Sequence, residues 1–248
     1  MRRIMIPVGL VAASVAVAAP VLAQSSGSNT SNTVLTTKVS VSPSKAGTKQ
    51  KPKGVKLTFK VHWETGADVD KPVVQTADVL FPKGSLYNGS KYAKCAQSVM
   101  ERGSVSECPA KSIMGTGSGT AYADQVLTTP KITVVNGGGN KVFLFTVLTN
   151  PARVAKPVPG TITKQSGKWA YKLHLVVPPS LQVVAGVPIA LRDISITAGG
   201  KSWAKDWLAT TSCTGGKYPF QLTTGFAPDS SGAPVGSATY DGSTPCSK

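Results

Sequence analysis

The stretch VKLTFKVHWE (55–64) decides the fold class, because its apolar residues recur at every second position. On an extended chain, one face carries the apolar side chains of Leu57, Phe59, Val61 and Trp63. The other face carries the polar side chains of Lys56, Thr58, Lys60 and His62. This period-two alternation is typical of a half-buried strand in an antiparallel sheet.

The same alternation recurs in VLTTKVSV (34–41) and in KWAYKLHLVV (168–177). By contrast, KVFLFTVL (141–148) is apolar on both faces, which predicts a central strand. The glycine-rich loop before it, from Asn136 to Asn140, predicts a hairpin with the strand ITVV (132–135). Further strands are expected at 73–81, 116–124, 188–197, 218–226 and 236–240.

Helix-like spacing of apolar residues occurs only in SKYAKCAQSVMER (90–102), which predicts one short helix. Many short strands between glycine and proline turns favour an all-β fold, an antiparallel β-sandwich. The strand order stays open between an immunoglobulin-like and a jelly-roll arrangement. Because no internal repeat or second boundary stands out, residues 34–248 are expected to form a single domain.

The N-terminus indicates export. Arg2 and Arg3 precede an apolar run, and Val21-Leu22-Ala23 is typical of a cleavage site, so residues 1–23 are predicted to be a signal peptide. A membrane anchor is the alternative, but the run is rich in alanine and contains two prolines. Residues 24–33 are expected to be a disordered spacer. No transmembrane segment is expected after cleavage, and the mature protein is expected to be secreted and extracellular.

The four cysteines all fall after the predicted cleavage site, and an even number in an exported chain indicates two disulfides. We favour the pairs Cys95–Cys108 and Cys213–Cys246, because each closes a local segment rich in Gly, Ser and Pro. A metal site is the alternative, but there is no CxxC motif, and both histidines are far from the cysteines in sequence.

Lysine dominates the charge of the chain. Of the 27 basic residues, removal of Arg2 and Arg3 leaves 25 against 11 acidic ones, a net charge of +14. Such a field attracts anionic polymers and lipid surfaces. Sparse aromatic residues argue against a specific nucleic-acid partner. The alternative is a solvated face without a partner. The densest segment predicts a polyanion contact at Lys45, Lys49, Lys51, Lys53, Lys56 and Lys60.

Catalytic signals are weak. His62 and His174 both lie on the polar side of their strands, and no GxSxG motif accompanies them. Glu64, Asp68 and Asp70 cluster in one turn, where calcium is an alternative to a simple polar hairpin. We expect no catalytic residues, no metal and no cofactor.

The stretch CPAKSIMGTGSGTAYA (108–123) carries Gly115, Gly117 and Gly119, as phosphate-binding loops do. A dinucleotide fingerprint needs GxGxxG and a P-loop needs Gly-Lys-Ser/Thr, and neither pattern is met here. The alternating glycines instead predict a strand with one bare face that another segment approaches closely. We expect the short helix near Cys95 to be that segment, and Ile113 and Met114 to anchor the stretch in the core.

The segment FPKGSLYNGSKYAKC, followed by ECPAKSIMGTGSGTA and later by SCTGGKYPFQLTTGF and Pro245-Cys246, resembles a group of secreted actinobacterial proteins of unknown function. That group has a Pro-x-Gly segment before a cysteine and a CPxxSxxGxGxA segment after it. The resemblance implies an exported, disulfide-bonded β-domain and supplies no catalytic residues.

These observations favour a non-catalytic binding or structural protein at the cell envelope or in the extracellular space. The alternative is an extracellular carbohydrate-active hydrolase on a jelly-roll scaffold, which needs two carboxylates facing one cleft. The ligand and the oligomeric state stay open.

Overall fold

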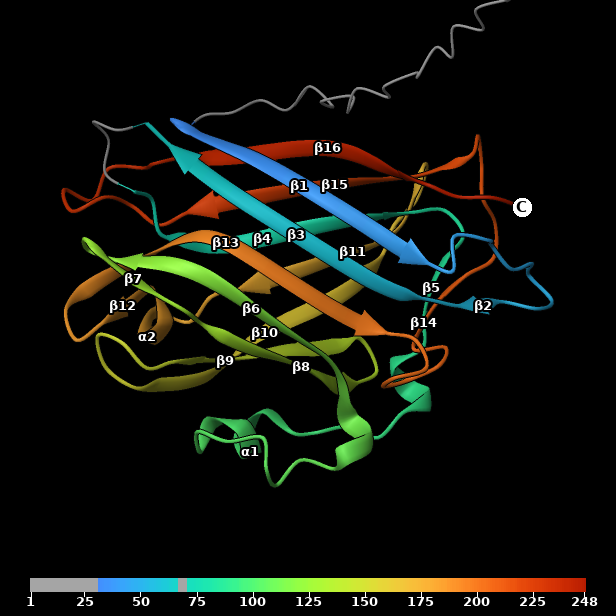
Figure 1. The fold of residues 1–248 in the computed structure, drawn as a ribbon, viewed down its shortest axis with the longest axis horizontal. Helices are drawn as coiled ribbons and strands as arrows, with labels where there is room; N and C mark the ends of the chain where they lie inside the picture. The colour runs from blue at the N-terminus through green and yellow to red at the C-terminus, as the bar shows by residue number, and fades with distance from the viewer. Residues whose placement is uncertain (1–30, 67–70) are drawn as a thin grey trace, which may run out of the picture.

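The computed structural model describes residues 31–66 and 71–248, and strands dominate this part of the chain (Figure 1). The predicted signal peptide and most of the predicted spacer lie outside the described residues, as do Asp68 and Asp70. Thr33, which the sequence assigned to the spacer, instead begins the first strand and is only 1% exposed.

All strand pairings are antiparallel, which confirms the predicted all-β fold. One large sheet has the order β1 (Thr33–Ser42), β3 (Lys56–Thr65), β13 (Val187–Gly199), β6 (Ile113–Ala123), β8 (Lys131–Gly138), β9 (Lys141–Leu148), β10 (Val154–Lys164), β11 (Trp169–Val176), β4 (Val74–Pro82), β15 (Lys217–Phe226) and β16 (Ser237–Pro245). Two short strands flank it, β7 (Val126–Thr128) on β6 and β12 (Val183–Val184) on β13. A small sheet is formed by β2 (Lys53–Gly54), β14 (Leu208–Thr210) and β5 (Ser85–Tyr87).

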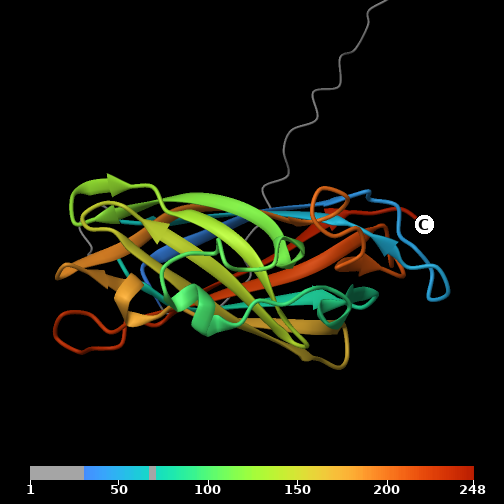
Figure 2. The ribbon, with the colours of Figure 1, turned by 90° about the horizontal axis from the view of Figure 1, so that it is seen from below.

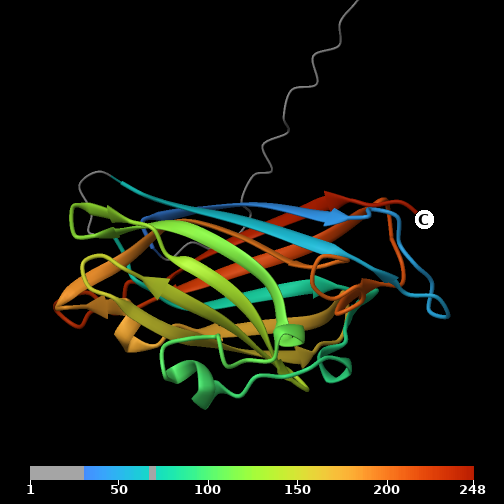
Figure 3. The ribbon, with the colours of Figure 1, turned by 60° about the horizontal axis from the view of Figure 1, so that its bottom comes forward.

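The large sheet folds over on itself, so its two halves form the two layers of the molecule. The strands at the ends of the order, β1 and β16, lie against each other, which nearly closes the sheet. Figures 2 and 3, which turn the molecule about its long axis, show the resulting flattened roll. The largest buried cluster joins Leu35, Val61 and Trp63 of one half to Phe220 and Leu222 of the other.

The strands follow the alternation of the sequence. In β1 and β3, the residues predicted to face inward are buried or half-buried, and the lysines between them are exposed. The apolar strand β9 lies inside the sheet between β8 and β10, and the predicted hairpin of β8 and β9 is present. Burial of the apolar face drives these contacts, because each buried aliphatic or aromatic side chain contributes about 1.5–3 kcal/mol.

The alternation did not reveal β10, whose sequence VAKPVPGTITK contains two prolines. Pro157 and Pro159 lie opposite Phe145 and Phe143 of β9, whereas the pairing with β11 begins only at Gly160. The prolines therefore occupy a part of the strand that is paired on one side only, where a missing N–H donor is tolerated.

The predicted helix over 90–102 is mostly absent, because only α1 (Gln97–Glu101) is α-helical. The buried side-chain amide of Asn136 donates hydrogen bonds to the carbonyl oxygens of Gly89 and Ala93, each at 2.9 Å. The N–H of Cys95 in turn donates to the Asn136 carbonyl oxygen at 2.9 Å. These bonds hold the segment against β8 and occupy groups that a helix would need. A second short helix, α2 (Pro179–Gln182), was not predicted.

Both predicted disulfides are confirmed. Cys95 and Cys108 have Cα atoms 5.3 Å apart and fasten the segment around α1. Cys213 and Cys246 have Cα atoms 5.9 Å apart and fasten the start of β15 to the end of β16.

The strand β13 lies beside the glycines of β6 and makes the close approach, so the prediction that the helix near Cys95 makes it is wrong. Gly115, Gly117 and Gly119 pair with residues of β13 whose side chains point into the roll: Ala198, Ile196 and Ile194. A Cβ atom on Gly115 would lie 2.2 Å from the carbonyl oxygen of Thr197, which leaves no room for a side chain. The helix α1 lies against β10 instead. The expected anchor is confirmed, since Met114 is fully buried and the partly buried Ile113 packs against the cluster that contains Cys95 and Cys108.

We predict that Gly115→Ala destabilises the protein by about 1–3 kcal/mol, because the added methyl group meets the β13 backbone rather than a flexible side chain. Urea unfolding followed by circular dichroism measures this change. Ser118→Ala on the exposed face of the same strand is the control and is expected to stay within about 0.5 kcal/mol of the wild type. Equal stability of Gly115→Ala and Ser118→Ala would contradict the close approach.

Candidate functional site

An apolar cavity of about 230 Å³ lies inside the roll. Side chains from both halves of the sheet line it, among them Phe59 and Val61 of β3, Ile196 of β13, Leu173 of β11 and Phe220 of β15. Protein interiors leave few voids larger than a water molecule. At about 24 cal/mol per Å³, a closed and empty void of this size would cost about 5.5 kcal/mol, which is comparable with the whole stability of many domains.

A second cavity of about 110 Å³ lies next to the first, on the side of α2. Residues lining both cavities include Trp63, Leu144 and Ile194, and the second extends to Leu181 of α2 and Ile189 of β13. The two cavities are therefore adjacent inside the roll. No carboxylate, histidine, cysteine or lysine is among the residues that line either cavity.

Hydroxyl groups accompany the apolar side chains at one part of the first cavity. Tyr87 is satisfied, because its hydroxyl donates to the carbonyl oxygen of Lys141 at 3.0 Å. Burial raises the pKa of Tyr87 to about 12, and the nearby Trp207 indole only partly opposes this rise. Thr210 and Tyr218 also line the cavity, yet their buried hydroxyls have no hydrogen-bond partner in the described structure.

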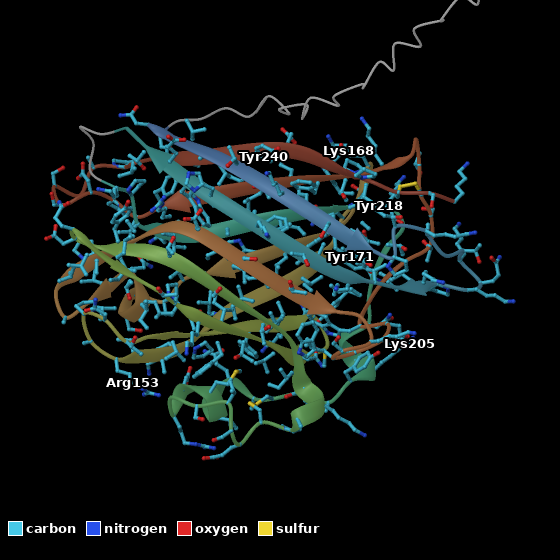
Figure 4. The ribbon with its side chains drawn as sticks, in the orientation of Figure 1. Arg153, Lys168, Tyr171, Lys205, Tyr218 and Tyr240 are labelled. Carbon is cyan, nitrogen blue, oxygen red and sulfur yellow. A yellow bond between two sulfur atoms is a disulfide. The ribbon has the colours of Figure 1, made fainter. Side chains whose placement is uncertain are left out.

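Lysines gather at the end of the roll formed by the small sheet and the Cys213–Cys246 disulfide, which we call the basic end. Backbone contacts bring its segments together: Lys53 lies opposite Thr210, Lys217 opposite Pro245, and the N–H of Lys83 donates to the carbonyl oxygen of Lys168 at 3.0 Å. Figure 4 shows Lys168 and Lys205 at this end together with Tyr171 and Tyr218, whereas Arg153 lies far from it.

The predicted polyanion contact is divided by the fold. Most of its members lie at the basic end, on the loop after β1, on β2 and at the start of β3: Lys45, Lys49, Lys51, Lys53 and Lys56. Lys60 does not join them, because it lies along the outer face of the sheet opposite Lys38. The fold adds lysines that are remote in sequence, namely Lys83, Lys168, Lys201, Lys205 and Lys217. Within the described structure, none of the lysines at the basic end forms an ion pair.

Both histidines pair with an aspartate on the outer face of the sheet. The Nδ1 atom of His62 lies 2.7 Å from Asp193, and that of His174 lies 2.7 Å from Asp78. Such a pair could orient a general base, but within the described residues no hydroxyl or thiol bonds to either ring. The aspartates come from strands remote in sequence, so the sequence pattern could not indicate these pairs.

The pKa of Asp193 lies below its ordinary value of 3.8. Partial burial alone would raise this pKa, but hydrogen bonds from Thr120, at 2.7 Å, and from His62 outweigh the effect of burial. The nearby Arg192 guanidinium acts in the same direction. The arrangement is an electrostatic contact between β3 and β13.

In the described part of the chain, no group of three or more His, Cys, Asp or Glu residues could hold a metal ion. Glu64 lies at the end of β3, but the two aspartates of the proposed calcium turn are outside the described ranges. None of the described helices is both long and apolar enough to cross a membrane.

The chain matches no protein-family model, and no curated protein is significantly similar to it. These comparisons do not test the resemblance to the secreted actinobacterial group, which stays a prediction.

We predict that Thr120→Val raises the pKa of Asp193, because it removes a hydrogen bond to the charged form. A lowered pKa contributes stability above the ordinary value of 3.8, and this contribution is lost as the pH falls through the lower folded value. The variant should therefore lose roughly 0.5 kcal/mol at neutral pH, a small amount because the aspartate is 44% exposed, and should match the wild type in acid.

Carboxyl carbon NMR titration measures this pKa, and urea unfolding across the acid range measures the stability. Thr116→Val, on the exposed face of the same strand, is the matched control and should leave the pKa of Asp193 unchanged. An unchanged pKa of Asp193 in Thr120→Val would show that the hydrogen bond from Thr120 does not lower this pKa.

Proposed function

We propose that this chain is a secreted, non-catalytic binding protein that takes up a small apolar molecule inside its rolled sheet. The cavity of about 230 Å³ carries this proposal. Even an engineered apolar cavity of about 150 Å³ stays dry and binds benzene. Since an empty cavity is costly, an apolar ligand that fills it would stabilise the protein.

The composition of the cavity lining supports binding rather than catalysis. General acid–base and nucleophilic catalysis draw mainly on carboxylates, histidine, lysine and cysteine, and neither cavity is lined by any of these residues. A glycoside hydrolase would need two carboxylates at one cleft. The paired aspartates Asp78 and Asp193 instead lie on the outer face of the sheet, engaged with histidines.

Secretion is part of the proposal, because the two disulfides are typical of proteins that fold in an oxidising compartment. The basic end would then meet anionic envelope polymers or lipid surfaces. Its lysines are exposed and without ion pairs within the described structure, so their charge is available to a partner.

We predict that Ala77→Leu weakens the binding of an apolar probe by at least about tenfold, because the added side chain enters the space that the probe would occupy. The fluorescence of N-phenylnaphthylamine, an uncharged dye that brightens in apolar surroundings, measures the affinity. The stability of the ligand-free variant should not fall, because leucine fills part of the void.

Ala96→Leu is the matched control, because Ala96 is exposed and lines neither cavity. It should bind the dye as the wild type does. Equal binding by Ala77→Leu and the wild type would place the dye outside the roll and contradict the proposal.

A second prediction concerns the basic end. The double variant Lys51→Gln/Lys53→Gln should bind vesicles of phosphatidylglycerol and phosphatidylcholine more weakly, by about fivefold per lysine. The charge-matched control Lys38→Gln/Lys60→Gln changes lysines of the outer sheet face and should lose less. Vesicle sedimentation at low and high salt measures the affinity of both double variants, and binding should weaken as salt rises. Equal losses of vesicle binding in the two double variants would contradict a contact localised at the basic end.

A further inference from the structure

Large apolar side chains are exposed at the end of the roll opposite the basic end, which we call the apolar end. Among the described residues, five such side chains are exposed, by 41% to 56%. All lie close to strand termini at this end, in β7, in β12, at the start of β1 and at the end of β11: Val126, Leu127, Val183, Val34 and Val176. Figure 1 shows β7 and β12 on the side away from the C-terminus. Scattered exposed apolar residues are ordinary, but their concentration at one end indicates an interaction site.

Two tight hairpins hold the apolar end outward. Only two residues join β6 to β7, and only two join β12 to β13. Positive φ angles at Asp124, Ala185 and Gly186 are typical of such short hairpin turns. Strand pairing extends up to the turn in both hairpins. The exposed side chains next to these turns are therefore fixed in place and cannot fold back onto the core.

The two hairpins belong to one run of paired strands. Ala123 of β6 lies opposite Val126 of β7 on one side and opposite Ile189 of β13 on the other. Pro188, next to Ile189 in the chain, lies opposite Val183 of β12. Ile189 also lines the second cavity, so the apolar end adjoins that cavity.

We propose that the apolar end docks on a lipid surface without net charge, such as a phosphatidylcholine bilayer. The tips of the two hairpins enter the interfacial layer of the lipid and bury their apolar side chains there. This docking surface is separate from the basic end, which then points away from the bilayer.

The shape of the apolar end favours lipid over a folded protein partner. A stable protein interface needs a continuous complementary surface of roughly 800 Å² on each partner. The exposed apolar side chains instead lie on separate projections, and Val34 and Val176 belong to different halves of the sheet. A fluid bilayer can accommodate each projection by itself.

The charges at the apolar end favour a lipid without net charge. Exposed side chains of both signs occur there, with Lys71 and Arg153 against Glu64 and Asp124. Their fields oppose one another, so this end lacks the uniform positive field of the basic end. Docking then depends on the burial of apolar surface and should be insensitive to salt.

A lipid surface is also a source of apolar molecules for the interior. Leu181 and Ile189 line the second cavity behind the apolar end, so docking brings this cavity close to the lipid. Uptake of a ligand from the lipid rests on the proposed function, whereas docking itself rests on the exposed side chains and the hairpins that hold them.

Flotation of the mature chain with phosphatidylcholine vesicles tests the docking. At about 1 M salt, where the Debye length is about 3 Å, the charges of the basic end are screened and the wild type should still bind. Val126→Ser/Leu127→Ser should weaken binding by at least about tenfold, because two exposed apolar side chains no longer enter the lipid. The control Lys51→Gln/Lys53→Gln changes the basic end and should bind as the wild type does.

A variant that strengthens docking tests the same surface without removing apolar contacts. Leu127→Trp should increase vesicle binding by roughly threefold, because tryptophan is favoured at the membrane interface. Vesicles with brominated acyl chains should quench the fluorescence of this variant more strongly than that of Ser243→Trp. The latter adds a tryptophan at an exposed position of the basic end, opposite Pro219.

Three results would overturn the docking proposal. The first is a wild type that does not bind phosphatidylcholine vesicles at high salt. The second is equal vesicle binding by Val126→Ser/Leu127→Ser and the wild type. The third is a concentration-dependent dimer, measured by analytical ultracentrifugation, that the same double variant abolishes, because the apolar end would then belong to a second copy of the chain.

The dye N-phenylnaphthylamine, added without vesicles, separates this proposal from the proposed function. Neither Val126 nor Leu127 lines a cavity, so Val126→Ser/Leu127→Ser should bind the dye as the wild type does. Dye binding without vesicle binding would overturn the docking alone. Vesicle binding without dye binding would support the docking and overturn the proposed cavity ligand.

Discussion

The close approach of β13 to the bare inner face of β6 is the constraint on which the architecture depends. Because Gly115, Gly117 and Gly119 have no Cβ atoms, β13 carbonyl oxygens lie within 2.2–2.6 Å of the positions that Cβ atoms would take. Ile194 and Ile196 of β13 can then face the interior without competition from β6. Glycines commonly accompany curvature in a sheet, and the curvature of this sheet brings β1 round to β16. Without that curvature the two halves could not enclose a cavity.

The sequence predicted what depends on local pattern and missed what depends on register. Alternation revealed strands such as β3 and β9, and local spacing revealed both disulfide pairs. The strand β10 escaped because its prolines weaken a strand signal, and only the one-sided pairing explains why they are tolerated. The helix near Cys95 was overestimated because Asn136, far along the chain, binds its carbonyl groups.

The candidate site could mostly not be predicted from the sequence, because it also depends on the order and register of the strands. Its walls come from strands of both halves of the sheet, and no single segment of the sequence predicts the order of those strands. The lysine-rich segment was visible, yet the register decides that Lys53 belongs to the basic end while Lys60 faces Lys38 on the open sheet. One signal was available: small residues at inward positions, such as Ala77 and Ala198, leave space where larger ones would fill the core.

The two disulfides fasten different parts of the roll, and only the Cys213–Cys246 bond lies at the basic end. On the chain-entropy account, loops of 13 and 33 residues give their disulfides about 3 and 4 kcal/mol, which is of the same order as the cost of the empty space. The larger loop closes at the basic end, where Cys213 and Cys246 flank the segments that carry Thr210, Tyr218 and Thr244. The chain therefore holds the basic end by a covalent bond, beside the part of the first cavity that Thr210, Tyr218 and Thr244 line. Loss of this bond would loosen the segments that form this part of the cavity wall.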